Sequence, residues 1–167
     1  MTPAKSWEPA LLLNCQKSSN SRIMDHFYAT AVAYCGSGIL IQGPSGSGKS
    51  DLALRLIDDD ADLIADDRVV IKVVGKELRL SPPESISGLI EVRGIGVVKI
   101  KTVRDIPLCL VVELELSNQT KRMPEIKEES IKDISIPIIG INAFESSSLA
   151  KIKIVLRYLD KKIELIS

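Results

Sequence analysis

The chain has 167 residues, of which 22 are basic and 22 acidic, so its formal net charge is zero. A chain of this length fits one domain with a substantial buried core. Because there is no net positive charge and only 4% of the residues are aromatic, neither nucleic acid nor an anionic membrane surface is expected as a partner. No apolar run reaches the length of a membrane span, and no segment is typical of a signal peptide.

The N-terminal part of the chain divides into an arm and the beginning of a folded domain. Residues 1–25 combine a short apolar run with a polar cluster, so we expect a poorly ordered arm followed by a single domain at residues 26–167. Thr30–Tyr34 and Gly38–Gln42 are apolar segments around a short break, which predicts a hairpin. Cys35 and Cys109 lie in apolar surroundings without a CxxC spacing, so we expect buried, reduced thiols.

A phosphate-binding motif of the form GxxxxGK[ST] follows the second strand. Small residues allow the backbone N–H groups to close around a phosphate, the lysine reaches the β- and γ-phosphates, and the final hydroxyl can ligate Mg²⁺. The apolar strand before the motif and the amphipathic Asp51–Ile57 segment after it supply the expected strand, loop and helix. The alternative is a Gly/Ser-rich surface turn that matches by chance. The predicted nucleotide-binding residues are Gly43, Pro44, Ser45, Gly46, Ser47, Gly48, Lys49 and Ser50.

The remaining pattern predicts an α/β domain with a mixed sheet and flanking helices. The apolar Leu63–Ile71 segment is interrupted by a charged triplet, and the segment from Ser117 to Glu129 is long and charged enough to form a mobile loop over the site. Ile131–Ile141 is expected to form a strand pair, and Ser146–Ile166 a helix. Further strands are expected at Arg68–Val74, Glu77–Leu80, Leu89–Arg93, Gly96–Ile100 and Leu108–Leu116.

Three carboxylates are candidates for the chemistry beside the phosphates. Asp66 and Asp67 end an apolar strand a short way past the loop and its helix, where an acid that works with a bound metal is expected, and Glu91 is a third. One aspartate can serve as a metal or water ligand and the other as proton acceptor. The alternative is that Asp66 and Asp67 belong to a simple turn. The acidic run at residues 58–62 is expected to be a solvated surface.

Three segments together resemble a known family. They are GPSGSGKSDLALRLI at residues 43–57, LIADDRV at residues 63–69 and LIEVRGIGVV at residues 89–98. In this combination the chain is similar to the catalytic domain of the HPr kinase/phosphorylase family, in its short form without a separate N-terminal domain. The resemblance implies a P-loop kinase domain related to the nucleotide-binding core of phosphoenolpyruvate carboxykinase. It also implies the use of ATP to phosphorylate a seryl residue of the phosphocarrier protein HPr.

The same resemblance assigns roles to individual residues. It makes Asp67 the proton acceptor for the attacking serine, with Asp66 beside it. Lys49 would stabilise the transferred phosphoryl group. Ser50 and Glu91 would hold Mg²⁺.

Other positions match the family less well. Arg122 falls near the family's active-site arginine, although a loop ion pair would explain it equally. The family's histidine position holds Tyr28, whereas His26, the single histidine of the chain, lies two residues earlier and is expected to be an exposed strand-end residue. Residues 137–142 lack the arginine of the family's PVxPGRN-type segment, which is associated with the phosphate-consuming reverse reaction. We therefore expect weak or absent phosphorolysis.

The resemblance further implies a cytoplasmic homo-oligomer, hexameric in the family, with ATP and Mg²⁺ as cofactors and HPr as substrate. Two other functions stay open at this point. One is a small-molecule kinase of the carboxykinase relatives, which would need further metal ligands and an arginine cluster. The other is an ATP-binding sensor without efficient transfer, which the tyrosine at position 28 makes conceivable.

Overall fold

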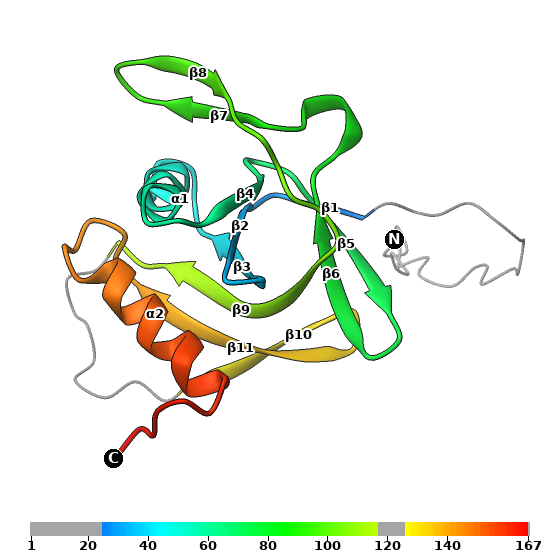
Figure 1. The fold of residues 1–167 in the computed structure, drawn as a ribbon, viewed down its shortest axis with the longest axis vertical. Coiled ribbons are helices and arrows are strands. Elements are labelled where there is room, and N and C mark those ends of the chain that lie inside the picture. Colours follow the sequence, from blue (N-terminus) through cyan, green and yellow to red (C-terminus); the bar gives the residue numbers. More distant parts are fainter. Residues whose placement is uncertain (1–24, 117–125, 167) are drawn as a thin grey trace, which may run out of the picture.

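The computed structural model describes residues 25–116 and 126–166. Within them, a curled sheet of nine strands is covered by two α-helices, and a separate two-stranded hairpin stands beside the first helix (Figure 1). The main strand order is β1-β5-β6-β9-β3-β2-β4, and β11 pairs with both β9 and β10. The strands are β1 (His26–Phe27), β2 (Thr30–Tyr34), β3 (Ser37–Gln42), β4 (Asp62–Ala65), β5 (Val69–Val74), β6 (Glu77–Ser81), β7 (Leu89–Val92), β8 (Gly96–Lys99), β9 (Ile106–Leu114), β10 (Lys127–Ile131) and β11 (Ile134–Ile141).

The direction of the strands places several loops at one edge of the sheet. β3, β9 and β11 are neighbours and run parallel, whereas the other pairs are antiparallel. Their carboxyl ends therefore meet at the same edge, where ligands bind in open α/β sheets. The loop after β3 and the loop after β11 both begin there.

Each helix buries an apolar stripe against the sheet. In α1 (Lys49–Asp58) the buried residues are Leu52, Ala53 and Leu56, and in α2 (Ser148–Leu159) they are Ser148, Ile152 and Leu156. These spacings of three and four residues keep the buried side chains on one face of each helix. A short 3-10 turn, η1 (Glu84–Ile86), precedes the hairpin. No helix in the described ranges is both long and apolar enough to cross a membrane.

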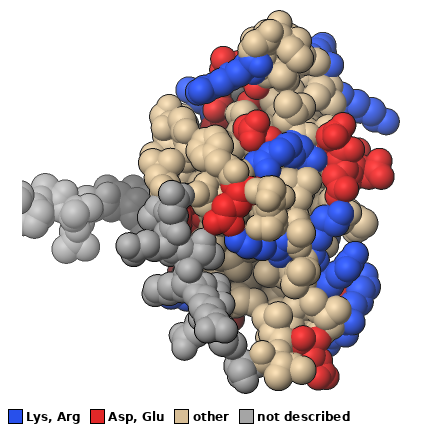
Figure 2. All heavy atoms as spheres, turned by 90° about the vertical axis from the view of Figure 1, so that its left-hand side faces the viewer, with Lys and Arg blue, Asp and Glu red and all other residues tan. Residues whose placement is uncertain are grey.

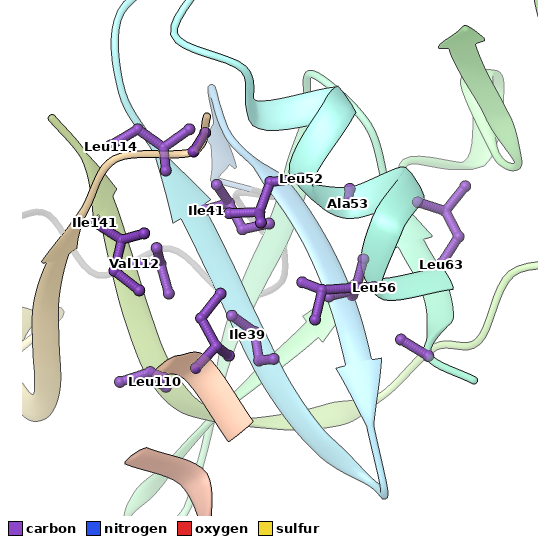
Figure 3. Packing of buried hydrophobic residues seen from close by; sticks show 14 of the residues in the cluster. Ile39, Ile41, Leu52, Ala53, Leu56, Leu63, Leu110, Val112, Leu114 and Ile141 are labelled. Atoms are coloured by element: carbon purple, nitrogen blue, oxygen red, sulfur yellow. The ribbon is translucent and has the colours of Figure 1, made fainter. Parts of the chain in front are cut away.

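The sheet has an apolar core on each of its two faces. On the helical side, Leu52 and Leu56 of α1 pack against alternate residues of β3 and β9, such as Ile41 and Val112 (Figure 3). Residues that alternate with these, including Leu40 and Val111, belong to the second core on the other face. Because successive side chains of a strand point to opposite faces, a central strand that is covered on both sides is apolar throughout. The rigid β3 and α1 thus hold the loop between them.

The elements predicted from the sequence are confirmed with several changes of boundary. The hairpin of β2 and β3 is present, and Cys35 and Gly36 form its turn with positive φ. Cys35 is exposed rather than buried, because its side chain projects from this turn, and Cys109 is half-buried. The apolar Leu63–Ile71 segment is divided between β4 and β5.

The C-terminal boundaries differ more. Strand β9 covers Ile106–Leu114 rather than residues 108–116, and β10 includes residues 127–129, which were expected to lie in a loop. The strand pair expected at residues 131–141 therefore begins at Lys127. The final helix ends at Leu159 rather than Ile166. The expected arm, apart from Asp25, and most of the expected mobile loop lie outside the described residues.

An ion pair joins the two helices at the end of α1. Lys153 of α2 lies 2.7 Å from the Asp59 carboxylate. The hydrogen bond from Lys153 lowers the pKa of Asp59, and the same bond raises the pKa of Lys153. The rest of the acidic run, Asp58, Asp60 and Asp62, is exposed as expected. Figure 2 shows acidic and basic side chains interspersed on one face of the molecule, in keeping with the zero net charge.

Candidate active site

The loop at residues 43–50 connects the carboxyl end of β3 to the first turn of α1. Gly46 has φ +78 and Gly48 has φ +95, a left-handed conformation that glycine adopts without steric cost. Gly48 is also the N-cap of α1, and an added Cβ there would lie 3.0 Å from the Cβ of Ala143. Because the glycine N-cap has no side chain to accept hydrogen bonds, the N–H groups of the first turn stay available to an anion.

Lys49 lies folded over this loop. Its Nζ donates hydrogen bonds to the carbonyl oxygens of Gly43 at 3.0 Å and Pro44 at 3.1 Å. Both acceptors are neutral, so a phosphate oxygen would be a stronger partner for the ammonium group. Ser47 is 2% exposed, and its buried hydroxyl has no hydrogen-bond partner among the described residues. Lys49, which lines the pocket, is therefore the cation of this loop that a ligand can reach.

Asp66 is held by hydroxyl groups from two other elements. Ser50 Oγ, in the first turn of α1, donates to Asp66 Oδ1 at 2.9 Å and lies 3.1 Å from Oδ2. Thr30 Oγ1, at the start of β2, donates to Asp66 Oδ1 at 2.8 Å. Thr30 is fully buried, and β2 pairs with β4 immediately before Asp66. The carboxylate is thus fixed against the last residue of the glycine-rich motif.

Thr30 was not among the residues predicted from the sequence. It is 36 residues from Asp66, and only the pairing of β2 with β4 brings the two together. Its place two residues after Tyr28, which occupies the family's histidine position, was the one available signal.

Asp67 points in a different direction from Asp66. It has φ +64, a left-handed conformation that aspartate tolerates better than most residues. It is exposed and lines a pocket of about 380 Å³ beside the 43–50 loop. Asp66 does not line this pocket. The structure therefore separates the adjacent aspartates, with one bonded to Ser50 and the other facing the open space.

The far wall of the pocket is formed by the β7–β8 hairpin, which stands over α1 in Figure 1. Glu91 and Arg93 line the pocket, together with Lys49 and Ser50 on the opposite side. Ile90, which precedes Glu91 in the sequence, is 1% exposed and packs in the same core as Leu52. Burial of Ile90 anchors the hairpin, and the three residues that follow it, including Val92, line the pocket.

The remaining predicted residues have different outcomes. His26 is exposed in β1, as expected. Tyr28 is 80% exposed, and its ring centroid lies 5.5 Å from the guanidinium carbon of Arg68, directly after the two aspartates. Arg122 lies outside the described residues. Ile141, in the 137–142 segment that lacks the arginine of the family's PVxPGRN-type segment, is 4% exposed and packs in the core.

The residues present suit Mg²⁺ bound together with phosphate. Ser50, Asp67 and Glu91 line one pocket and offer hard oxygen donors. No group of three or more His, Cys, Asp or Glu residues that could hold a metal ion occurs within the described ranges. Mg²⁺ bound to nucleotide needs only one or two carboxylates, since phosphates and waters complete its coordination. The pocket thus fits Mg²⁺ with phosphate better than a metal held by protein alone.

Comparisons with known proteins agree with this geometry. Residues 22–158 match the family model of the HPr Serine kinase C-terminal domain. An HPr kinase/phosphorylase of Brevibacillus brevis is 40% identical over 129 residues, which cover 70% of this chain and 42% of that protein. One of Chlorobium limicola is 34% identical over 139 residues, with 75% and 42% covered.

The fold is also similar to a solved structure. The Hpr(Ser) kinase/phosphatase from Coxiella burnetii has a TM-score of 0.72 and 25% identity, and the match covers 83% of this chain and 97% of that chain. Each match covers 42% of the relative's length, so the chain spans less than half of these two curated relatives. The chain belongs to the HPr kinase/phosphorylase family and corresponds to its C-terminal domain.

Proposed function

We propose that this chain catalyses the ATP- and Mg²⁺-dependent phosphorylation of a seryl residue on HPr, with weak or absent phosphorolysis. The observation that carries the proposal is the separation of the two aspartates. Asp66 is bonded to Ser50 of the glycine-rich loop, whereas Asp67 faces the pocket that Lys49 and Glu91 also line. A phosphoryl-transfer site needs one group that positions the bound nucleotide and another that accepts the proton of the acceptor hydroxyl.

In the proposed reaction the seryl oxygen attacks the γ-phosphorus of ATP. The bond from that phosphorus to the β,γ-bridging oxygen breaks, ADP leaves, and the seryl proton passes to the Asp67 carboxylate. Lys49 exchanges its bonds to the Gly43 and Pro44 carbonyls for bonds to the phosphates. The 43–50 loop serves as a P-loop, in which Gly43, Pro44, Ser45, Gly46, Ser47 and Gly48 supply the phosphate cradle.

Ser50 and Glu91 are the proposed Mg²⁺ ligands, and Asp66 acts through Ser50. Bound Mg²⁺ would offset the negative charge of the phosphates. The Ser50 hydroxyl donates a hydrogen bond to Asp66, so a lone pair of the Ser50 oxygen is directed away from Asp66 and can bind a cation. Thr30 keeps the Asp66 carboxylate in the orientation that this requires.

The proposal of weak phosphorolysis rests on the missing arginine in residues 137–142. The reverse reaction consumes inorganic phosphate, an anion that a nearby arginine would bind. Ile141 is apolar and packed in the core. Phosphate would therefore lack that partner. Arg122, which falls near the family's active-site arginine, is proposed as a further catalytic cation.

The wider setting of the reaction is proposed on the same family basis. We propose that the fold is related to that of phosphoenolpyruvate carboxykinase and that the protein is cytoplasmic. We also propose that it assembles into a homo-oligomer, which is hexameric in the family. Each of these can be tested separately from the transfer step.

Label transfer from [γ-³²P]ATP to purified HPr tests the proposal. Wild type should label HPr on serine, whereas Lys49→Ala and Asp67→Asn should lose most of this activity. Incubation of seryl-phosphorylated HPr with inorganic phosphate should form little pyrophosphate and leave most of the seryl phosphate on the protein. No label on HPr with wild type would contradict the kinase proposal, and rapid phosphate-dependent loss of label would contradict the directional part.

A second candidate is an ATP-binding sensor without efficient transfer. Tyr28 favours it, because the family's histidine position, next to the aspartates, holds an exposed tyrosine whose ring faces Arg68. ATP binding in the absence of HPr labelling would support the sensor. Label transfer at many turnovers per minute would exclude it.

A further inference from the structure

Phe144 is an exposed aromatic residue beside the 43–50 loop. It lies in the loop between β11 and α2, is 64% exposed, and lines the same pocket as Lys49 and Ser50. An added Cβ on Gly48 would lie 3.2 Å from its Cζ, so the ring edge is close to the N-cap of α1. Because the side chain is largely exposed and lines the pocket, a flat ligand could contact it.

The loop that carries Phe144 is held in place by its own hydrogen bonds and by α1. The Phe144 N–H donates to Asn142 Oδ1 at 3.0 Å. The hydroxyl of Ser148 is 2.7 Å from the carbonyl oxygens of both Asn142 and Glu145, and the Arg55 guanidinium donates to the Ala143 carbonyl. The backbone is therefore ordered before any ligand arrives, which reduces the entropy that binding must offset.

The position agrees with the topology of the sheet. β3 and β11 both run parallel to β9, so the loops that follow them, with Lys49 and with Phe144, share one edge. A nucleotide whose phosphates occupy the 43–50 loop would extend its base along this edge. Phe144 is the one aromatic residue among those that line the pocket in the described part of the chain, and Leu54 adds apolar surface.

We propose that the Phe144 ring stacks on the base of the bound nucleoside triphosphate. This rests on the proposed function, because it requires the triphosphate to bind at the 43–50 loop. Every base has a π-face, so stacking contributes affinity with little discrimination among bases. In this proposal the 43–50 loop binds the phosphates of the nucleotide, and Phe144 binds its base.

The experiment compares ATP, GTP and inorganic tripolyphosphate, each with Mg²⁺, by isothermal titration calorimetry. Phe144→Ala should raise the Kd for ATP and GTP by about tenfold, equivalent to ~1.4 kcal/mol, and leave the Kd for tripolyphosphate unchanged. Phe144→Tyr keeps the aromatic face and should bind ATP like wild type, whereas Phe144→Leu should bind it like the alanine variant. Tyr158→Ala, which removes a partly exposed aromatic ring from α2, is the matched control and should change none of these affinities.

Three results would overturn the inference. One is an equal loss of ATP and tripolyphosphate affinity in Phe144→Ala, which would mean that the phosphate loop is distorted. A second is unchanged ATP affinity with a raised KM for HPr, which would assign Phe144 to protein docking. The third is equal wild-type affinity for ATP and tripolyphosphate, which leaves the proposed function intact but gives the base no role. Failure of wild type to bind either ligand would refute the proposed function itself, and the inference with it.

Discussion

Replacement of Thr30 by valine tests whether the buried hydroxyl positions Asp66. Valine keeps the β-branched shape that suits β2 but removes the donor that lies 2.8 Å from Asp66 Oδ1. A hydrogen bond to a charged group contributes about 1.5–3 kcal/mol. Asp66 keeps its contacts with Ser50, so the loss is limited to this one bond. At roughly 2–4 °C per kcal/mol for a chain of this size, Tm should fall by about 3–12 °C.

Thr30→Val should also reduce phosphotransfer by about 10- to 100-fold, the range for loss of a residue that orients a metal-linked ligand. Thermal unfolding by circular dichroism and label transfer to HPr measure the two effects. Thr30→Ser is the matched control, because it keeps the hydroxyl and loses one buried methyl group, at about 0.8 kcal/mol. If serine and valine lower activity equally, or if valine changes neither quantity, the assigned role of the hydroxyl is wrong.

Three further predictions concern the loop, the core and the ion pair between the helices. Gly48→Ala should lower the free energy of unfolding by about 1–2 kcal/mol because of the left-handed φ, and by more because the added Cβ would contact Ala143. It should also abolish ATP binding. ATP affinity retained in calorimetry would show that the loop tolerates a side chain. Leu56→Ala, at a fully buried site in α1, should lower the unfolding free energy in urea by about 2–5 kcal/mol, and a loss below about 1 kcal/mol would contradict the packing described. Because Lys153 lowers the pKa of Asp59, the pair stabilises the fold above the ordinary aspartate pKa and this contribution disappears as pH falls through the lowered value. Asp59→Asn should therefore flatten the fall in Tm below about pH 4, and an unchanged acid profile would count against the pair.

The elements around the 43–50 loop could be predicted because their signals are local. Apolar alternation and a short turn define β2 and β3, and the motif itself defines the loop and the start of α1. The sequence also made Asp66 a candidate, since an acid after the next strand is typical of phosphate-loop proteins, but its hydrogen bond from Ser50 was not predicted. The contribution of Thr30 could not be derived in this way, because it depends on which strands pair.

Errors in the prediction have identifiable physical causes. The charged residues 127–129 indicated a loop, yet they lie in β10. Among the described strands β10 pairs with β11 alone, and charged side chains are common on such edge strands. Cys35 has apolar neighbours but occupies a turn with φ +51, from which its side chain projects into solvent.

The end of α2 was misplaced for a related reason. The apolar residues after Leu159 continue the sequence pattern, yet Leu165 is 52% exposed and Ile166 is 91% exposed. Periodicity predicts a buried helix face only where another element covers it. Phe144 was missed because a single aromatic residue in a loop has no pattern, and only its position beside Gly48 indicates a role.

The central claim is that Asp67 accepts the seryl proton, while Asp66 positions the nucleotide through Ser50. The most direct test measures ATP affinity and the single-turnover rate of HPr labelling in wild type, Asp67→Asn and Asp66→Asn. The account predicts that Asp67→Asn binds Mg·ATP nearly as well as wild type but transfers at least about 100-fold more slowly, in the range expected for general-base catalysis. It also predicts that Asp66→Asn weakens Mg·ATP binding itself. A wild-type transfer rate in Asp67→Asn would contradict the account.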